Sequence, residues 1–348
     1  MKHFTTWLVG AIVFASCKST PKGGVIATDA IKPVIVTEQV AFDTDDPAIW
    51  INKKDTANSL IIGTDKATNG GLYLFNLQGK IVNKVTGLQR PNNVDIAYNV
   101  LLNGQRVDIA LTTEREGDKV RIFTLPDLKS VDNGGIEVFA GETERGPMGI
   151  AVYTRPADST VFVIVGRKSG PADGYLWQYQ LSDSAGSLSM NVVRKFGKYS
   201  GKKEIESIAV DNKLGYIYYS DEQTGVHKYY ADPALNNNTE LALFGTTGFV
   251  SDHEGISIYQ QTDSTGYILV SNQQANTFMI FPREGTKESV NNHPLLAQVP
   301  VSTLESDGSE VTSISLPQFP EGLFVAMSNG KVFHFYDWRD IARKAGLK

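Results

Sequence analysis

The stretch "ESIAVDNKLGYIYYSDEQTGVHKYY" (residues 206–230) carries the pattern that decides the fold. It contains three short runs, "ESIAVD" (206–211), "GYIYYSDE" (215–222) and "VHKYY" (226–230), all rich in β-branched and aromatic residues. Short runs of this composition, separated by turn residues such as Gly and Asn, are typical of β-strands. The stretch therefore predicts three consecutive strands.

The same three-run pattern occurs six times along the chain. The third runs begin, 48 to 56 residues apart, at Leu72, Val120, Leu176, Val226, Phe278 and Val332. The second runs occupy residues 60–66, 108–115, 161–168, 215–222, 266–273 and 322–329. Six copies of about fifty residues predict an all-β fold, a six-bladed β-propeller. A helical pattern competes only in "DWRDIARKA", near the C-terminus.

A propeller has to close its ring, and the segment before the first copy is suited to that role. "KPVIVTEQVAF" (32–42) reads as a strand and precedes the first complete blade. We expect it to supply the outer strand of the last blade, so that the two ends of the chain meet. The alternative is an N-terminal arm that lies loosely on the surface.

The first residues, "MKHFTTWLVGAIVFASC", have the features of an export signal. Lys2 is followed by an apolar run that is too short for a stable membrane span. "FASC" resembles a bacterial lipoprotein signal, in which Cys17 becomes the lipidated first residue. We therefore expect a signal peptide (1–16), a flexible tether (17–31) and a propeller domain (32–348), anchored by lipid in the periplasm or at the outer-membrane surface. A plain signal peptide with a fortuitous cysteine is the alternative.

Cysteine count and charge limit the partners. Cys17 is the only cysteine, so the sequence predicts no internal disulfide. The net charge of -5 and the lack of a basic run argue against nucleic-acid binding. Six blades closed by both chain ends can be stable alone, and we expect a monomer.

The stretch "AFDTDDPAIW" (41–50) places three carboxylates within four positions. Crowded carboxylates stay ionised most easily near a cation. Aligning the six copies puts one residue of each at the same point before its first strand: Asp46, Asn93, Met148, Glu206, Glu254 and Thr312. We expect these residues to form a ring at one end of the central channel. An oxygen-rich ring suits Ca²⁺, whereas the chain has no ligand pattern for zinc.

The ends of the second runs supply a different set of side chains. They are Lys66, Arg115, Arg167 with Lys168, Glu222, Gln273 and Asn329. A cationic arc beside an acidic ring predicts a site for a polyanion held by both metal and guanidinium groups. Taken singly, each acid reads as a turn residue and each cation as a solvated one. Their coincidence across the blades favours the functional interpretation.

Several motifs together resemble the β-propeller phytases over about residues 40 to 345. They are "DTDDPAIW", "GGLYLFNLQGK", "NNVDIAY", "LNGQRVDIA", "IESIAVDNKLGYIYYSDE", "DHEGISIY" and "FVAMSNG". The resemblance implies a six-bladed enzyme that binds several Ca²⁺ ions and hydrolyses inositol hexakisphosphate. It also implies attack on phosphorus by a metal-activated water, without a covalent enzyme intermediate.

By position, the resemblance assigns roles to individual residues. It implies calcium ligands at Asp45, Asp46, Glu206, Glu222, Glu254 and Asp307, with Glu222 also in a catalytic role. Lys66 and Arg115 correspond to phosphate binders, and Arg167 stands where the family has a lysine. We therefore expect substrate contacts from Lys66, Arg115, Arg167 and Lys168, the first three also catalytic.

The chain departs from the family at several positions. Met148 replaces a tyrosine, Lys168 a glutamate and Thr312 an aspartate, and Val332 lies where an asparagine amide is expected. These losses predict weaker or fewer calcium sites. They leave two alternatives open: a non-catalytic propeller that binds an anionic ligand or a protein partner, and another six-bladed enzyme such as a sugar-lactone hydrolase.

Overall fold

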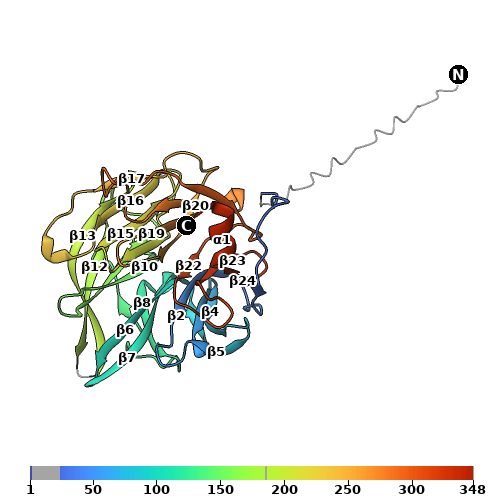
Figure 1. The fold of residues 1–348 in the computed structure, drawn as a ribbon. Coiled ribbons are helices and arrows are strands. Elements are labelled where there is room, and N and C mark those ends of the chain that lie inside the picture. The colour runs from blue at the N-terminus through green and yellow to red at the C-terminus, as the bar shows by residue number, and fades with distance from the viewer. Residues whose placement is uncertain (2–23, 185, 348) are drawn as a thin grey trace.

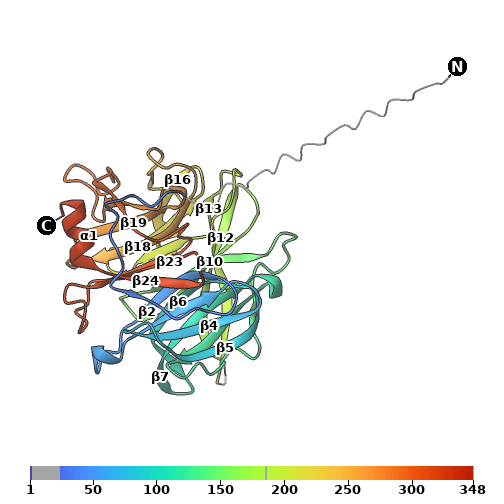
Figure 2. The same cartoon turned by 90° about the vertical axis from the view of Figure 1, so that its right-hand side faces the viewer.

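The computed structural model describes residues 24–184 and 186–347, together with Met1. The predicted signal peptide (apart from Met1) and Cys17 lie outside these residues. In the described ranges the strands form six four-stranded sheets, antiparallel throughout. The sheets follow one another around the molecule in chain order, which brings blue β2 beside red β23 and β24 (Figures 1 and 2). The predicted six-bladed β-propeller is confirmed.

The first three blades are continuous in the sequence. From the channel outward, the first contains β2 (Thr44–Trp50), β3 (Leu60–Asp65), β4 (Thr68–Asn76) and β5 (Ile81–Gln89). The second contains β6 (Pro91–Leu102), β7 (Gln105–Glu114), β8 (Lys119–Leu125) and β9 (Ile136–Glu137). The third contains β10 (Pro147–Thr154), β11 (Val161–Arg167), β12 (Asp173–Ser184) and β13 (Ser187–Lys198).

The last three blades follow the same order. The fourth contains β14 (Ile208–Asp211), β15 (Tyr216–Asp221), β16 (Gly225–Tyr230) and β17 (Ala242–Phe244). The fifth contains β18 (His253–Gln260), β19 (Gly266–Asn272), β20 (Thr277–Pro282) and β21 (Ala297–Pro300). The sixth contains β22 (Ser309–Thr312), β23 (Leu323–Ser328), β24 (Val332–Asp337) and β1 (Ile35–Val36).

Short helical segments complete the described chain. Four 3₁₀ turns are η1 (Thr56–Asn58), η2 (Arg115–Gly117), η3 (Pro233–Leu235) and η4 (Gln273–Ala275). The helical pattern near the C-terminus forms α1 (Trp338–Ala345), whose N-cap Asp337 accepts a hydrogen bond from the Arg339 amide. Among the described helices, none has the length and apolar character needed to cross a membrane.

The N-terminal strand closes the ring, as the sequence predicts. β1 pairs with β24, where Ile35 lies opposite Phe335 and Val36 opposite His334. The regular strand is shorter than the predicted 32–42, but the Thr37 amide also donates to the Phe333 carbonyl at 3.0 Å. Part of the predicted tether is also packed on the propeller, because the Ile31 amide donates to the Pro300 carbonyl at 3.0 Å. The outer strand of the last blade therefore comes from the beginning of the chain.

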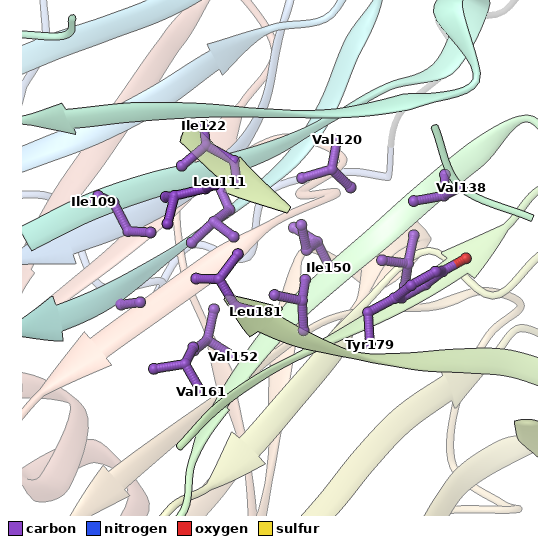
Figure 3. Close-up of a cluster of buried hydrophobic side chains, with 14 of the residues drawn as sticks. Ile109, Leu111, Val120, Ile122, Val138, Ile150, Val152, Val161, Tyr179 and Leu181 are labelled. Carbon is purple, nitrogen blue, oxygen red and sulfur yellow. The ribbon is translucent and has the colours of Figure 1, made fainter. Parts of the chain in front are cut away.

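The core lies between the blades. In the described chain the buried hydrophobic side chains form six clusters, one at each junction between neighbouring blades. Figure 3 shows the cluster between the second and third blades, where side chains of β7 and β8 face those of β10 and β12. Successive side chains of β11 serve opposite clusters: Val163 and Val165 face the second blade, and Phe162 and Ile164 face the fourth. This explains why the second strand of a blade is apolar along its length rather than alternating.

One buried ion pair joins the fourth and fifth blades. The Arg283 guanidinium donates to both carboxylate oxygens of Asp211, at 2.6 and 2.8 Å, and both side chains are fully buried. A further guanidinium N–H of Arg283 donates to the carbonyl oxygens of Thr262 and Thr265. The pair ties the inner strand of one blade to the loop beyond the third strand of the next.

Candidate active site

The inner strands surround a channel that contains two cavities with different linings. The larger cavity, about 540 Å³, is lined by residues of all six inner strands. The smaller, about 250 Å³, lies where those strands begin and where the second strands end. Its lining comprises five carboxylates, five cationic side chains and one amide: Glu204, Glu206, Glu222, Glu254, Asp307, Lys66, Arg90, Arg115, Lys168, Lys203 and Gln273. This smaller cavity is called the charged cleft below.

The strand register corrects the predicted ring in the last blade. Thr312 lies at the far end of β22, paired with Leu323, and lines the larger cavity. Asp307 precedes β22 and lines the charged cleft. The prediction that Thr312 belongs to the ring is therefore wrong, and Asp307 takes its place. The run "TSISLP" (312–317) resembles the first runs of the other copies, but the inner strand of this blade is β22, which ends at Thr312.

The strand register also replaces two other members of the predicted ring. Equivalent positions on the six ladders are Asp45, Asn92, Met148, Glu206, Glu254 and Asp307. Asp46 and Asn93, one residue further on, line the larger cavity instead. There the Asp46 carboxylate accepts a hydrogen bond from the Val94 amide at 3.0 Å. Asp46, a predicted calcium ligand, thus lies outside the charged cleft. The adjacent residue Asp45, also a predicted ligand, borders the cleft through its contact with Lys66.

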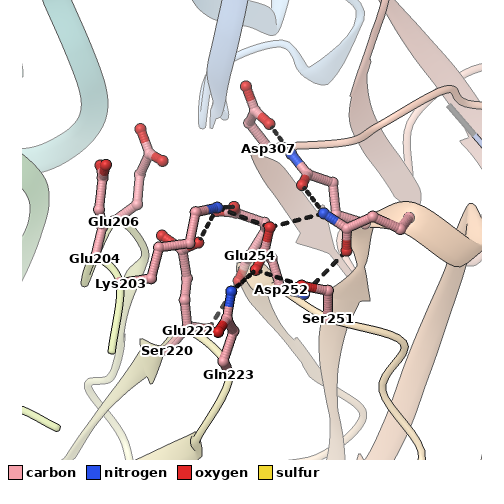
Figure 4. A network of polar contacts seen from close by, with 12 residues as sticks. Lys203, Glu204, Glu206, Ser220, Glu222, Gln223, Ser251, Asp252, Glu254 and Asp307 are labelled. Atoms are coloured by element: carbon pink, nitrogen blue, oxygen red, sulfur yellow. Dashed lines mark hydrogen bonds and ion pairs between the residues drawn. The ribbon is translucent and has the colours of Figure 1, made fainter. Parts of the chain in front are cut away.

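Two overlapping groups of carboxylates, all but Asp252 lining the cleft, have the spacing of a metal site. Oxygen atoms of Glu222, Asp252 and Glu254 lie within 4.8 Å of one another, and so do those of Glu204, Glu206 and Glu222. Figure 4 shows these side chains converging from the segment before β14, the turn after β15 and the beginning of β18. Glu204 was not singled out from the sequence, because it lies in the irregular segment before β14.

Cationic side chains bridge the carboxylates. Lys66 contacts Asp45 and donates to Asp307 at 2.8 Å. Lys168 pairs with Glu204 at 2.7 Å. The contacts of Lys66 with Asp307 and of Lys168 with Glu204 each link two neighbouring blades.

Arg115 is held by a second polar network. Its guanidinium donates to the side-chain carbonyl of Asn92 and lies 3.6 Å from Glu206. The Asn92 amide in turn donates to Glu206 at 2.6 Å. Both partners fix the orientation of Arg115 at the start of η2, with the guanidinium on the cleft wall.

Arg167 does not reach the cleft. It is the last residue of β11, only 1% exposed, and its guanidinium lies 4.7 Å from the ring centre of Phe139. It also donates to Glu142 at 3.2 Å. Because side chains alternate along a strand, Lys168 and not Arg167 shares the orientation of Lys66 and lines the cleft. The placement does not support the predicted substrate contact by Arg167, which acts as a buried cation between aromatic rings.

Burial and mutual repulsion disturb the titration of the carboxylates. Burial raises the pKa of Glu254 well above its usual range, and the charges of Glu206 and Glu222 raise it further. Burial raises the pKa of Glu222 to about 8, against the opposing effect of Lys203. Burial also acts on Glu206, but Lys66, the hydrogen bond from Asn92 and the charge of Arg115 together outweigh it and lower the pKa of Glu206. Without a further cation, part of the cluster is therefore protonated at neutral pH.

The donor set fits a hard divalent cation. The side-chain oxygens are carboxylate or amide oxygens, which Ca²⁺ prefers. One carboxylate oxygen of Glu254 is buried without a hydrogen-bond partner, and a buried oxygen each of Asp45 and Glu222 contacts an ammonium group, that of Lys66 and that of Lys203. Buried acceptors without a donor are costly unless a cation satisfies them. These residues would hold calcium, with Met148 contributing no side-chain oxygen.

Comparisons with known proteins agree with this picture. A 3-phytase of Bacillus subtilis (strain 168) is 27% identical over 321 residues, which is 87% of this chain and 81% of that protein. Two solved structures share weak overall likeness. One, described as "Structure of Dos1 propeller", has a TM-score of 0.44 and 10% identity over 84% of this chain and 67% of that one. The other, "Crystal structure of BBS1N in complex with ARL6DN, soaked with lead", has a TM-score of 0.47 and 11% identity over 85% and 78%.

The two structural likenesses score too low to support an argument about the site. The decisive finding is the match of a family model, described as Phytase, to residues 7–336, nearly the whole chain. Together with the six blades and the relative from Bacillus, this match shows that the chain belongs to the phytase family of β-propellers.

Proposed function

We propose that this protein is a calcium-dependent phosphomonoester hydrolase that releases phosphate from myo-inositol hexakisphosphate. The observation that carries the proposal is the meeting of five carboxylates and five cationic side chains in one cleft at the end of the channel. Membership of the phytase family and the 3-phytase relative support this reaction type. A polyanionic substrate needs cations on the protein, and a metal-assisted hydrolysis needs clustered carboxylates.

The chain's own residues divide into two roles. Asp45, Glu206, Glu222, Glu254 and Asp307 would hold calcium, which supplies an activated water and neutralises charge on the phosphoryl group. Lys66, Arg115 and Lys168 lie along the same wall and would bind phosphate oxygens. The Arg115 guanidinium is pre-oriented by Asn92, which favours a fixed phosphate position. Export as a lipoprotein anchored through Cys17 and a monomeric state stay predictions from the sequence.

The direct test is phosphate release from inositol hexakisphosphate by the purified protein, with calcium varied from chelated to millimolar. We expect release that depends on calcium and stops in excess chelator. Release that is independent of calcium would contradict the metal role, and no release at any calcium concentration would contradict the catalytic proposal.

A non-catalytic anion-binding propeller is the second candidate. It is favoured by the ion pairs that already balance the cleft, such as Lys66 with Asp307 and Lys168 with Glu204. Under this alternative, inositol hexakisphosphate binds and raises the melting temperature but is recovered intact.

Calcium should stabilise the protein more at higher pH. Glu222 has a folded-state pKa near 8, above the ordinary value of 4.5, so the folded protein binds more protons than the unfolded one between these values. Stability of the metal-free protein therefore falls as pH rises through this window. Calcium binding reverses the penalty because it favours the ionised carboxylates. We expect the calcium-induced rise in Tm to grow from pH 5.5 to pH 8, measured by thermal unfolding with calcium and with chelator. A Tm rise that is constant with pH would show that these carboxylates are already ionised without metal.

A further inference from the structure

Lys203 contacts the acidic cluster, although its segment belongs to none of the repeated strands. It lies in the loop before β14, and its ammonium group contacts Glu222, donates to Asp252 at 2.7 Å and lies 3.9 Å from Glu254. Figure 4 shows the Lys203 nitrogen reaching into the space between these three carboxylates. Burial lowers the pKa of Lys203, but the hydrogen bonds to Asp252 and Glu222 outweigh it and raise that pKa, so the side chain is cationic.

These three carboxylates are also one of the two groups whose spacing would hold a metal ion. The ammonium of Lys203 and a divalent cation in this group would therefore use the same oxygens. Two cations a few ångströms apart repel each other strongly in a partly buried site. The Lys203 ammonium and a calcium ion therefore exclude each other from this group of carboxylates.

The ammonium satisfies the cluster only in part. Glu222 and Glu254 are 1% and 2% exposed, whereas the Lys203 side chain is 37% exposed and enters from the solvent side. Glu254 lines the cleft, and one of its oxygens remains buried without a hydrogen-bond partner. A single positive charge faces three carboxylates, and capacity for a further cation remains.

We propose that Lys203 is a built-in counter-ion that takes one calcium position in the charged cleft, so that the protein binds one calcium ion fewer there than its carboxylates could hold. The inference rests on the proposed function only in taking calcium as the metal of this cleft. A tethered ammonium needs no recruitment from solution, so it holds the three loops together when calcium is scarce. The other acidic group, around Glu204 and Glu206, and the unpartnered oxygen of Glu254 are left for the metal.

The test compares calcium binding by the wild-type protein with that of Lys203→Met, a substitution that keeps the length of the side chain and removes its charge. We expect Lys203→Met to bind one more calcium ion per chain in equilibrium dialysis at millimolar calcium. We also expect it to have a lower Tm than wild type in chelator and a larger calcium-induced rise. Lys202→Met is the matched control, because this substitution removes the same net charge. The Lys202 ammonium donates to the Gln223 carbonyl at 2.9 Å and not to a carboxylate of the cluster. Equal stoichiometry and affinity in Lys203→Met and wild type would overturn the proposal.

A measurement on the wild-type protein does not depend on the variant folding. Acetylation of lysines, read by mass spectrometry with and without calcium, should leave Lys203 protected in both conditions and modify Lys202 in both. Calcium-dependent labelling of Lys203 would overturn the proposal, since the metal would then displace the ammonium. Neither readout uses phosphate release. A protein that proves inactive on inositol hexakisphosphate therefore still gives a clear answer about Lys203.

Discussion

Replacement of Glu254 by glutamine is expected to reduce calcium-dependent phosphate release by at least about 100-fold, because loss of even an indirect metal partner costs 10- to 100-fold. Glu254 is the second residue of β18, nearly fully buried, and one of its oxygens has no protein partner. The Glu254 carbonyl accepts a hydrogen bond from the Ser220 hydroxyl at 2.8 Å, and this contact survives the substitution. The fold should therefore persist while the cluster loses one charge. The measurement is initial rate against calcium concentration, up to saturation.

Glu310→Gln provides the matched control for this variant. Glu310 is also a buried carboxylate on an inner strand, and burial raises its pKa well above the usual range, but it lines the larger cavity and not the charged cleft. We expect Glu310→Gln to retain the wild-type rate. Wild-type rates for Glu254→Gln at saturating calcium would show that Glu254 is not a metal ligand.

Arg283→Met should have the largest effect on stability. The substitution leaves the Asp211 carboxylate fully buried without its guanidinium partner, and breaking a buried pair in this way costs about 3–5 kcal/mol. We expect a loss of this size in the free energy of unfolding, measured by denaturant titration of wild type and Arg283→Met at the same calcium concentration. Because the pair lies between the fourth and fifth blades, the loss arises at a blade junction far from the cleft residues.

Two further variants test whether the unpaired charge causes the loss of stability in Arg283→Met. Asp340→Ala removes an exposed pair, Arg343 with Asp340 at 3.0 Å, and should change stability by less than about 1 kcal/mol. The double variant Arg283→Met/Asp211→Leu should be more stable than Arg283→Met alone, because it removes the unpaired charge. A double variant as unstable as the single would show that the cost comes from packing and from lost hydrogen bonds, those of Arg283 to Thr262 and Thr265 and those of Asp211 from the Lys213 and Leu214 amides, not from the buried charge.

The fold was predictable because its signal is repeated six times. A single run such as "GYIYYSDE" could be any strand, but its recurrence fixed the number of blades, and "KPVIVTEQVAF" revealed how the ring closes. The site was predictable only where the repeat holds its register. The cleft is lined as expected by Lys66, Arg115, Glu206 and Glu254. Lys66 and Arg115 each directly follow the last paired residue of their second strand, and Glu206 and Glu254 each stand two residues before a paired residue of their inner strand.

The failures have local causes. The run "TSISLP" follows β22 and resembles the first runs of the other copies, so the alignment placed Thr312 where Asp307 belongs. At the end of β11, strand alternation turns Lys168 to the cleft and Arg167 away from it, and two adjacent cations could not be told apart by charge. Lys203 gave no signal at all, because it lies on an irregular loop with no counterpart in the other copies.

The pairing of β1 with β24 has a consequence for synthesis. While a ribosome is still making the last blade, the residues that precede β24, up to residue 331, can form at most five complete sheets. Until β24 emerges, β1 has no neighbour, and the aromatic contact between Phe75 and Phe333 that joins the first blade to the last cannot form. The nascent chain is thus an open arc with two unpaired edges and one exposed apolar junction. The last two edges are covered only once β24 has emerged and pairs with β1.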